Sequence, residues 1–596
     1  MLGDRYKAYW CKGRIPALII ASAFIYLLNI SWLRWGSLLI DTGRELYVPW
    51  SILSGKMLYK DIFYEFGPLT PYLNAFLCVI FGVHIRSFII AGILTVALMC
   101  ILIYKISRIF LAPIFSTLSV LTFLFVFAFN QHYEAGIFNY IIPYSYASIY
   151  SMLFAITTLF FYYYILTKEK KAYTYLCGFF VLLTLATRIE IGIMLIVAIF
   201  IGIILDSPRG NGFKKRFRMI LTCCLFPVLA VSLVYGLFAI ITRGSIIDKD
   251  VFLINLDTKG PLTGHTLGTI NFWKNISIIS KSILYYIGIS TLFFAGGWAL
   301  FLIRKFSIMK KTFLIIILAY IVMSLTVLFQ REFFPYDMQY RCAPIICAWI
   351  FIFAYRKYRR TAEKKFLFLM IFSIFSLLLM TRMLFAVKAE HNGFYLLVPG
   401  MLCYYFFFLK IIPETFTTIQ MRNFYRFGFV VLSASFIISQ AALSHYMYKN
   451  RTLEISSPKG AMRVRPGYYR CKQLLAYLRE NADPSESLVV FPEGLTLNFL
   501  SERESPMHQY AFLPLLFKNP DFEKGVIKDL EDNEVKYIVI LRRDTSDYGA
   551  SRFGIDYAQG IIRYLAKHYV IEKQFGPWPF TKNEFSLVLL KRTKTP

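Results

Sequence analysis

The sequence predicts a helical domain that crosses a membrane many times, followed by a small α/β domain at the carboxyl end. Two observations support this fold class. The 596 residues are 57% hydrophobic, which is more apolar than a soluble chain of this length would be. The apolar residues are also gathered into long runs up to about residue 443, whereas residues 444–596 have an ordinary globular composition. We therefore expect two domains, 1–443 and 444–596.

The chain is strongly basic, with 65 Lys and Arg against 35 Asp and Glu and a formal net charge of +30. In a soluble chain this excess would suggest nucleic-acid binding. Most of the basic residues, however, lie in short loops between apolar runs, where Lys and Arg set the orientation of a membrane protein. We therefore expect contact with membrane lipids and no nucleic-acid partner.

A helix that crosses a membrane needs about 20 apolar residues. The sequence contains about thirteen such runs, some of them short for a full span. The basic segment before the first run is followed by no small-residue cleavage site, so we expect an uncleaved first helix rather than a signal peptide. The expected spans are Ile15–Gly36, Arg86–Tyr104, Leu111–Phe129, Tyr144–Leu166, Ala172–Thr187, Ile191–Leu205, Met219–Ile241, Ile276–Ile303, Phe313–Phe329, Cys342–Tyr355, Phe366–Met383, Phe394–Leu409 and Phe427–Ala442.

Alternate loops between these spans differ in charge. One set is short and strongly basic, and reads KISR, KEKK, RGNGFKKRFR, RKFSIMKK and RKYRRTAEKK. The positive-inside rule puts these loops in the cytoplasm together with the amino terminus. The loops of the other set face outward: residues 37–85, Gln131–Pro143, Thr242–Asn275, Arg331–Arg341 and Lys388–Gly393. An odd number of spans then puts residues 444–596 outside as well.

The carboxyl-terminal region alternates between helical and strand patterns. YYRCKQLLAYLREN and QGIIRYLAKHY have helical periodicity, whereas SLVVF, KYIVIL and EFSLVLLKR are short apolar runs typical of strands. This alternation predicts a small α/β domain. Its acidic residues Glu493, Glu502 and Glu504 are expected to be solvated. The cysteines show no disulfide framework and no zinc-ligand spacing.

The first outward loop, residues 37–85, is rich in charge. The stretch DTGRELYVPWSILSGKMLYKDIFYEFGPLTPYLNA holds four acidic and three basic residues among aromatic and turn residues. Functional groups often lie in such loops. The plain alternative is that Asp41 only caps a helix, while Asp61 and Glu65 are solvated or pair with Lys56 and Lys60. The four acidic residues are Asp41, Glu45, Asp61 and Glu65.

A short helix is expected at the start of this loop. Asp41 is a favourable N-cap residue, and Gly55 is a favourable stop. Leu46, Trp50 and Leu53 would share one face of that helix. We therefore expect it to lie in the membrane interface rather than to cross the bilayer.

The loop stretch quoted above resembles the GT-C superfamily of membrane glycosyltransferases, in particular bacterial family 39-like enzymes of the protein-mannosyltransferase and aminoarabinose-transferase type. LLTLATRIEIG also resembles the helix–break–helix segment of that family, with its basic and its acidic residue. In this resemblance Asp41 matches the catalytic acid of the first outer loop, and Glu65 falls near a second acid. Phe66 and Gly67 depart from the pattern, because one branch of the family has a lysine there.

The resemblance implies an enzyme of the bacterial cytoplasmic (inner) membrane. Such an enzyme takes a sugar from a polyprenyl-phosphate donor and transfers it to an acceptor lipid, polysaccharide or protein at the outer face. The leaving phosphate is a stable anion that needs little protonation, so one carboxylate suffices, unlike in glycosidases. Asp41 would act as general base toward the acceptor hydroxyl, and direct displacement would invert the anomeric carbon. Fixed cations would stabilise the phosphate.

Several further residues are candidates for substrate binding. Arg188 and Glu190 interrupt an apolar stretch, where a charge costs about 2.5–3.5 kcal/mol and usually faces a cavity. The alternative for them is a local ion pair. Arg382, Lys388 and His391 cluster at an outer membrane edge, where they could bind carrier phosphate or lipid headgroups. The candidate substrate-binding residues are Arg44, Glu45, Asp61, Glu65, Arg188, Glu190, Arg382, Lys388 and His391.

No cofactor is required by this chemistry. The loop carboxylates could supply oxygen ligands to a divalent metal, but no histidine cluster or strict spacing demands one. Two other functions stay open. A lipid or polysaccharide transporter would carry charges through its central spans and often has repeated halves, which we do not find here. A non-enzymatic envelope assembly protein would use its outer region to bind partners.

Overall fold

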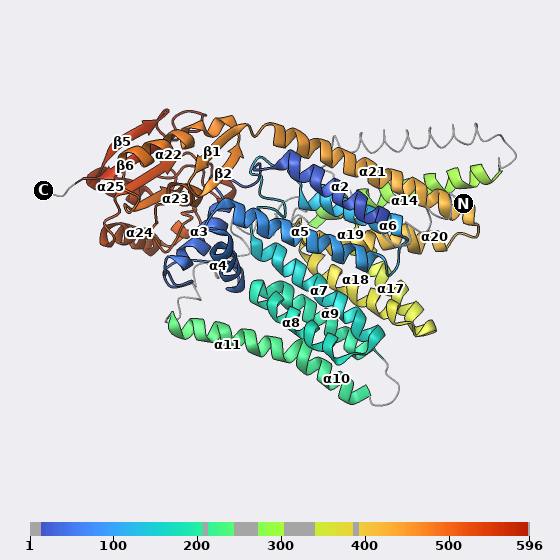
Figure 1. Cartoon of the computed structure of the whole chain (residues 1–596). Helices are drawn as coiled ribbons and strands as arrows, with labels where there is room; N and C mark the ends of the chain where they lie inside the picture. Colours follow the sequence, from blue (N-terminus) through green and yellow to red (C-terminus); the bar gives the residue numbers. More distant parts are fainter. Residues whose placement is uncertain (1–13, 207–211, 243–271, 303–339, 385–392, 594–596) are drawn as a thin grey trace.

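The computed structural model describes residues 14–206, 212–242, 272–302, 340–384 and 393–593. Figure 1 shows a long bundle of helices with a smaller region of strands and helices at one end. The first outer loop, with α3 and α4, lies where the two parts meet. The arrangement agrees with the predicted fold class, a helical membrane part followed by a small α/β part.

Eight of the described helices are long and apolar enough to cross a membrane, and four shorter apolar helices accompany them. The chain is therefore a multi-pass membrane protein. Each expected span falls largely on a helix, except Phe313–Phe329, which lies outside the described residues. The helices of this part are α2 (Arg14–Ser31), α3 (Thr42–Leu53), α4 (Leu69–Phe81), α5 (Ile85–Ser107), α6 (Pro113–Thr122), η1 (Phe123–Ala128), α7 (Tyr146–Lys168), α8 (Lys171–Thr187), α9 (Ile189–Leu205), α10 (Gly212–Ile220), η2 (Leu221–Leu225), α11 (Phe226–Ile241), α14 (Phe272–Leu302), α17 (Ala343–Thr361), α18 (Lys364–Leu384), α19 (Leu397–Phe406), η3 (Phe407–Ile411), α20 (Ile412–Glu414) and α21 (Ile419–Lys449).

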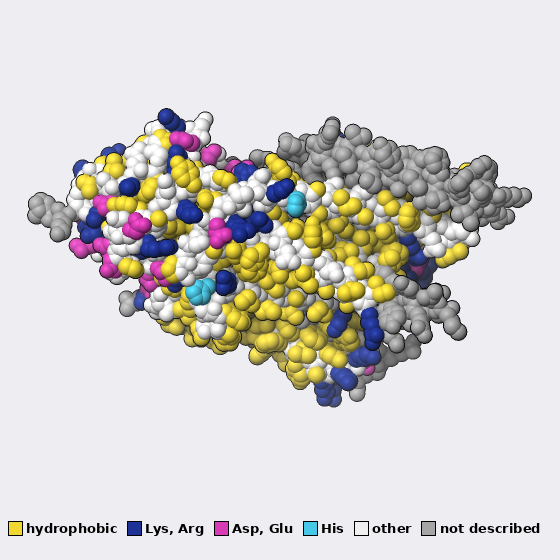
Figure 2. All heavy atoms as spheres, turned by 45° about the horizontal axis from the view of Figure 1, so that its top comes forward, with side chains coloured by type: hydrophobic (Ala, Val, Ile, Leu, Met, Phe, Trp, Pro, Cys, Tyr) yellow, Lys and Arg dark blue, Asp and Glu magenta, His cyan; other side chains and the backbone are white. Residues whose placement is uncertain are grey.

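Many large apolar side chains of these helices face outward. On α11, for example, Leu233 is 65% exposed and Ile240 is 76% exposed. Figure 2 shows hydrophobic side chains over the flank of the helical part, while charged side chains gather on the strand-containing part and at the opposite end of the helices. So large an apolar surface is unfavourable in water, and it is the surface that contacts lipid.

The region after α21, here called the tail (residues 450–593), folds as a small α/β unit. Its main sheet has the strand order β3-β4-β6-β5; β3 and β4 are parallel, and the other neighbours are antiparallel. Alternate residues of β3 and β4 belong to two hydrophobic clusters, one shared with α22 and the other with α24 and α25, so both faces of the sheet are covered. The elements of the tail are β1 (Leu453–Ser457), β2 (Gly460–Val464), η4 (Pro466–Tyr468), α22 (Tyr469–Asn481), β3 (Leu488–Phe491), α23 (Leu495–Ser501), η5 (Leu516–Lys518), α24 (Pro520–Asp532), β4 (Tyr537–Leu541), η6 (Ser546–Tyr548), α25 (Gln559–His568), β5 (Tyr569–Phe575) and β6 (Leu587–Arg592).

The predicted strands of the tail correspond to β3, β4 and β6, and the predicted helices to α22 and α25. The edge strand β5 and the hairpin β1–β2 are not evident from the sequence. Most side chains of β5 are exposed, so the strand shows neither a buried apolar run nor a clear alternation. The expected boundary between residues 443 and 444 falls inside α21, which continues to Lys449 before β1 begins.

The helix predicted at the start of the first outer loop is present as α3, but its surroundings differ from the prediction. Leu46 is fully buried, whereas Leu53 on the predicted lipid-facing side is 40% exposed. Nine residues of α3 are buried, including the polar residues Arg44 and Glu45. The helix is covered because α23 of the tail packs along it. Much of the helix therefore contacts protein, and its position in the membrane interface stays a prediction.

Gly43 allows this close contact between α3 and the tail. A Cβ atom on Gly43 would lie 2.3 Å from the backbone nitrogen of Thr496 and 2.8 Å from the Cβ of Leu495. Backbone atoms cannot give way as a flexible side chain can, so a larger residue at position 43 would have to displace α23. The tail is thus held against the membrane part through a glycine contact.

We predict that Gly43→Val loosens the tail, because its side-chain carbons would overlap the backbone of Thr496. Overpacking of this kind costs about 1–3 kcal/mol. The thermal unfolding temperature in detergent should fall, and trypsin should cut the tail faster. Gly525→Ala is the control, because nothing lies within 4 Å of a Cβ at that position in α24. It should leave the digestion rate unchanged; equal behaviour of the two variants would contradict the contact.

Candidate active site

Asp41 stands immediately before α3 in a backbone conformation that is unusual for a residue other than glycine. Its φ and ψ angles are 50° and −50°. The side chain makes no capping hydrogen bond, so the prediction that it acts as an N-cap is wrong for the carboxylate. Oδ1 lies 3.2 Å from Nη1 of Arg44, and within the described residues Oδ2 makes no hydrogen bond. Strained conformations of this type cost about 1–3 kcal/mol and cluster at functional sites.

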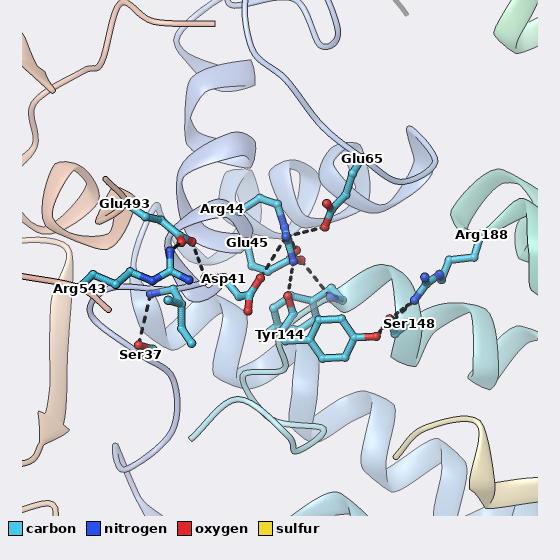
Figure 3. Close-up of polar contacts among 12 residues, drawn as sticks. Ser37, Asp41, Arg44, Glu45, Glu65, Tyr144, Ser148, Arg188, Glu493 and Arg543 are labelled. Carbon is cyan, nitrogen blue, oxygen red and sulfur yellow. Dashed lines mark hydrogen bonds and ion pairs between the residues drawn. The ribbon is translucent and has the colours of Figure 1, made fainter. Parts of the chain in front are cut away.

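Arg44 is the centre of the site (Figure 3). Its guanidinium is buried, and it contacts three carboxylates. Nε donates to Oε1 of Glu45 at 2.9 Å, while Nη1 donates to Oε1 of Glu65 at 2.6 Å and to Oδ1 of Asp41 at 3.2 Å. Nη2 donates to the backbone carbonyl of Tyr144. Three of the four loop acids named from the sequence are thus brought together by one side chain.

The charge of Arg44 is strongly favoured by these partners. Burial alone would lower the pKa of its guanidinium, but Glu65, Glu45 and Asp41 outweigh burial and hold the pKa well above its ordinary value. Glu45 is itself buried, and its Oε2 accepts the backbone N–H of Tyr146 at 2.9 Å. Because Arg44 is already matched by carboxylates, it organises the acids and is poorly suited to bind a further anion.

Arg188 lies at the break between α8 and α9, as the sequence predicts. It is in an extended conformation, with φ −147° and ψ 109°. Nε donates to Oε1 of Glu190 at 2.6 Å, so the local ion pair that was the alternative for these two residues is formed. Nη1 donates to Oγ of Ser148 at 2.5 Å and to the hydroxyl of Tyr395 at 2.7 Å. Within the part of the chain that the structure describes, Nη2 makes no hydrogen bond.

Two aromatic side chains connect the arginines. The ring of Phe66 lies 5.2 Å from the guanidinium carbon of Arg44 and 4.6 Å from that of Arg188, which are cation–π distances. Tyr144 accepts from Arg44 through its carbonyl and from Arg188 through its hydroxyl, the latter at 3.4 Å. Gly67 packs so tightly that a Cβ would lie 2.2 Å from the carbonyl oxygen of Ala186. The two residues that replace the family's lysine thus form a support for both guanidinium groups.

The tail supplies two charged residues that sequence reasoning missed. Glu493, expected to be solvated, is only 8% exposed. Its Oε1 accepts the backbone N–H of Asp41 at 3.3 Å, and its Oε2 pairs with Arg543. Figure 3 shows the two residues on the side of Asp41 opposite Arg44. No sequence signal links position 493 to position 41, because the contact exists only once the tail has docked.

Of the remaining predicted site residues, Asp61 lies in a separate turn. Asp61 accepts the backbone N–H of Met57 at 2.8 Å in an exposed turn. Lys56 pairs with Glu504 of the tail at 3.1 Å rather than with an acid of its own loop. Arg382 belongs to α18, and Lys388 and His391 lie outside the described residues.

Metal binding was considered for the loop carboxylates. Among the described residues, no group of three His, Cys, Asp or Glu side chains is arranged to hold a metal ion. Asp41, Glu45 and Glu65 instead contact one shared guanidinium, that of Arg44. We derive no step through a metal ion.

A hollow of about 790 Å³ lies away from these residues, between the end of α21 and the tail. Neither Asp41 nor either of the two arginines lines it. The hollow lies where the tail and the membrane part separate. Its exposed lining includes an ion pair between Arg465 and Glu134. We therefore assign the site from the convergence of charged groups at Asp41 and not from cavity volume.

We predict that Arg44→Met destabilises the fold by about 3–5 kcal/mol, because it leaves the buried Glu45 carboxylate without its partner. The stability of Arg44→Lys should lie between those of the wild type and Arg44→Met, because one ammonium group cannot reproduce the planar guanidinium that contacts three acids. Lys56→Met is the control, because it breaks a partly exposed ion pair worth at most about 1 kcal/mol. Unfolding in denaturant measures all three. Equal losses for Arg44→Met and Lys56→Met would show that the cluster is not a stabilising centre.

Neither a protein-family model nor a curated protein sequence matches the chain. Solved structures do. The Archaeoglobus fulgidus oligosaccharyltransferase, crystallised with Zn and sulfate, aligns with a TM-score of 0.51 at 12% identity, over 94% of this chain and 72% of that chain. ArnT from Cupriavidus metallidurans, bound to undecaprenyl phosphate, aligns with a TM-score of 0.43 at 11% identity, over 96% and 97% of the two chains. The arabinofuranosyltransferase AftD from Mycobacteria aligns with a TM-score of 0.44 at 12% identity, over 98% and 40%.

At these identities the likeness concerns the fold, and the oligosaccharyltransferase carries the comparison because its alignment alone among the three exceeds a TM-score of 0.5. The alignment includes the membrane helices and the tail, since it spans nearly the whole chain. This structural likeness agrees with the family resemblance seen in the sequence of the first outer loop and of the segment around Arg188. The chain therefore shares the fold of the Archaeoglobus fulgidus oligosaccharyltransferase.

Proposed function

We propose that this protein is a membrane glycosyltransferase that moves a sugar from a polyprenyl-phosphate donor to an acceptor hydroxyl. The observation that carries the proposal is the Asp41 carboxylate, which is held by Arg44 through Oδ1 and retains 31% of its side-chain exposure. A carboxylate with one oxygen fixed and one oxygen accessible is suited to accept a proton. The GT-C fold and the match of Asp41 to the family's catalytic acid give independent support.

In this mechanism Asp41 removes the proton of the acceptor hydroxyl as the oxygen attacks the anomeric carbon of the sugar. The bond from that carbon to the phosphate oxygen breaks, and the lipid phosphate leaves as an anion. One displacement inverts the anomeric configuration. Arg44 orients the Asp41 carboxylate through Oδ1, and its contacts with Glu45 and Glu65 fix the guanidinium itself.

Arg188 is the residue we propose for the donor phosphate. Its Nε and Nη1 are engaged by Glu190, Ser148 and Tyr395, which fix the plane of the guanidinium. The two N–H groups on Nη2 have no acceptor among the described residues and can bind phosphate oxygens. Such fixed donors stabilise the charge that grows on the leaving group. Arg382, Lys388 and His391 stay candidates for additional phosphate contacts.

We propose that the reaction takes place at the outer face of a bacterial cytoplasmic membrane. The basic loops put the amino terminus in the cytoplasm. The tail contacts Asp41 through Glu493, so the tail and the site lie on the same side. With the tail in the periplasm or outside the cell, the acceptor is a surface lipid, polysaccharide or protein, and the donor is a lipid of the outer leaflet.

We predict that Asp41→Asn abolishes turnover, with a loss of at least about 10²-fold, because the amide cannot accept the acceptor proton. Purified enzyme is supplied with undecaprenyl-phosphate sugars, and release of undecaprenyl phosphate is measured. Asp61→Asn, in the same loop but in a separate exposed turn, should turn over normally. Full activity of a folded Asp41→Asn variant would favour the transporter or assembly functions over the enzyme.

We also predict that Arg188→Gln raises the KM for the donor by at least about tenfold, since it removes a charged bidentate contact worth about 1.5–3 kcal/mol. Arg188→Lys should recover part of the affinity, because it restores charge without the planar fork. Glu190→Gln leaves the guanidinium in place and serves as the control. A donor KM that is unchanged in Arg188→Gln would assign phosphate binding to another cation.

A further inference from the structure

We propose that Glu493 and Arg543 of the tail form a positioning pair that holds the backbone of Asp41 in its active conformation. The inference rests on the proposed role of Asp41 as the base. It gives the tail a role in the reaction in addition to its packing against the membrane part. Neither residue needs to touch substrate, because both act through Asp41.

The first argument is the backbone of Asp41. A φ angle of 50° lies in a region that residues with a Cβ rarely adopt, so contacts outside the residue must maintain it. Within the part of the chain that the structure describes, the backbone N–H of Asp41 donates to Oε1 of Glu493 at 3.3 Å. An Asp at a helix N-terminus usually caps the helix with its own carboxylate. Because Glu493 accepts the N–H of Asp41 and Arg44 draws the carboxylate away, Oδ2 is left accessible.

The second argument is that a neighbouring cation balances the charge of Glu493. A buried carboxylate beside Asp41 would repel it and would be costly without a partner. Arg543 supplies that partner, and its side chain is only 11% exposed. The guanidinium carbon of Arg543 lies 5.8 Å from the ring of Tyr548, which fixes its position further. The pair therefore brings a hydrogen-bond acceptor to Asp41 without adding net charge.

The third argument is the rigidity of the elements that carry the pair. β3 and β4 are adjacent and parallel, with Phe491 opposite Ile540. Glu493 and Arg543 follow the carboxyl ends of these two strands, which lie at one edge of the sheet. Both strands are buried throughout. The pair thus projects from the most firmly packed part of the tail toward the start of α3.

Other contacts dock the tail without reaching Asp41, and they provide a matched control. Glu504 pairs with Lys56 at 3.1 Å, and the backbone N–H of Ser505 donates to the hydroxyl of Tyr47 at 2.7 Å. Glu504, like Glu493, is a tail carboxylate that contacts the first outer loop. A variant at Glu504 therefore weakens docking without changing the hydrogen bond to Asp41.

The test uses the full-length protein with Glu493→Leu, which removes the acceptor, and Glu493→Gln, which keeps an acceptor oxygen without charge. Glu504→Gln is the control. Hydrogen exchange of the peptide spanning residues 38–44 should become at least about tenfold faster in Glu493→Leu and should be close to wild type in Glu504→Gln. Release of undecaprenyl phosphate should show kcat reduced by about 10–100-fold in Glu493→Leu, partial recovery in Glu493→Gln and a donor KM within about threefold of wild type.

Glu493→Leu leaves Arg543 buried without its partner, so it could unfold the tail. The double variant Glu493→Leu/Arg543→Leu avoids this, because replacing both members of a buried pair by apolar residues is often neutral for stability. It should fold and show the same loss of kcat as Glu493→Leu. A folded double variant with wild-type kcat overturns the inference. If Asp41→Asn keeps wild-type turnover as well, it is the proposed function that fails.

Discussion

The site depends on one buried guanidinium. Arg44 holds Asp41, Glu45 and Glu65, which would otherwise repel one another at the junction of two structural parts. Acidic side chains this close require a fixed cation, because a buried carboxylate without a partner is costly. The planar guanidinium can meet acceptors in several directions at once, which an ammonium group cannot do with the same geometry. The path of the first outer loop from α3 to Glu65 therefore follows from the position of Arg44.

The same junction explains why the tail cannot be treated as a separate module. Gly43 brings α3 against the backbone of Thr496, and Glu493 reaches the backbone of Asp41. Both contacts fall within the first turn of α3, where the carboxylate of Asp41 would otherwise cap the helix. Docking of the tail thus changes the structural role of the Asp41 side chain. Because Arg44 holds Oδ1, the carboxylate does not cap α3.

The sequence alone predicts the features that depend on local pattern. Apolar runs predict the spans, and the break at Arg188 predicts the end of α8, because each depends on neighbouring residues. Helix α3 is also predicted, but its burial is not, since the surface that covers it lies about 450 residues later in the chain. Glu493 was expected to be solvated for the same reason. The contacts of Arg44 with Glu65 and of Asp41 with Glu493 depend on the fold, so residue spacing does not predict them.

Phe66 and Gly67 stand where one branch of the family that this chain resembles has a lysine, and both are closely packed. Phe66 supports both guanidinium groups with its ring, a role that a lysine side chain could not fill beside them. Gly67 has no room for any side chain against the carbonyl of Ala186. Arg44 is fully matched by carboxylates, whereas Arg188 keeps N–H groups on Nη2 without an acceptor among the described residues. This difference is why we propose Arg188, at the break between α8 and α9, and not Arg44 as the cation for the leaving phosphate.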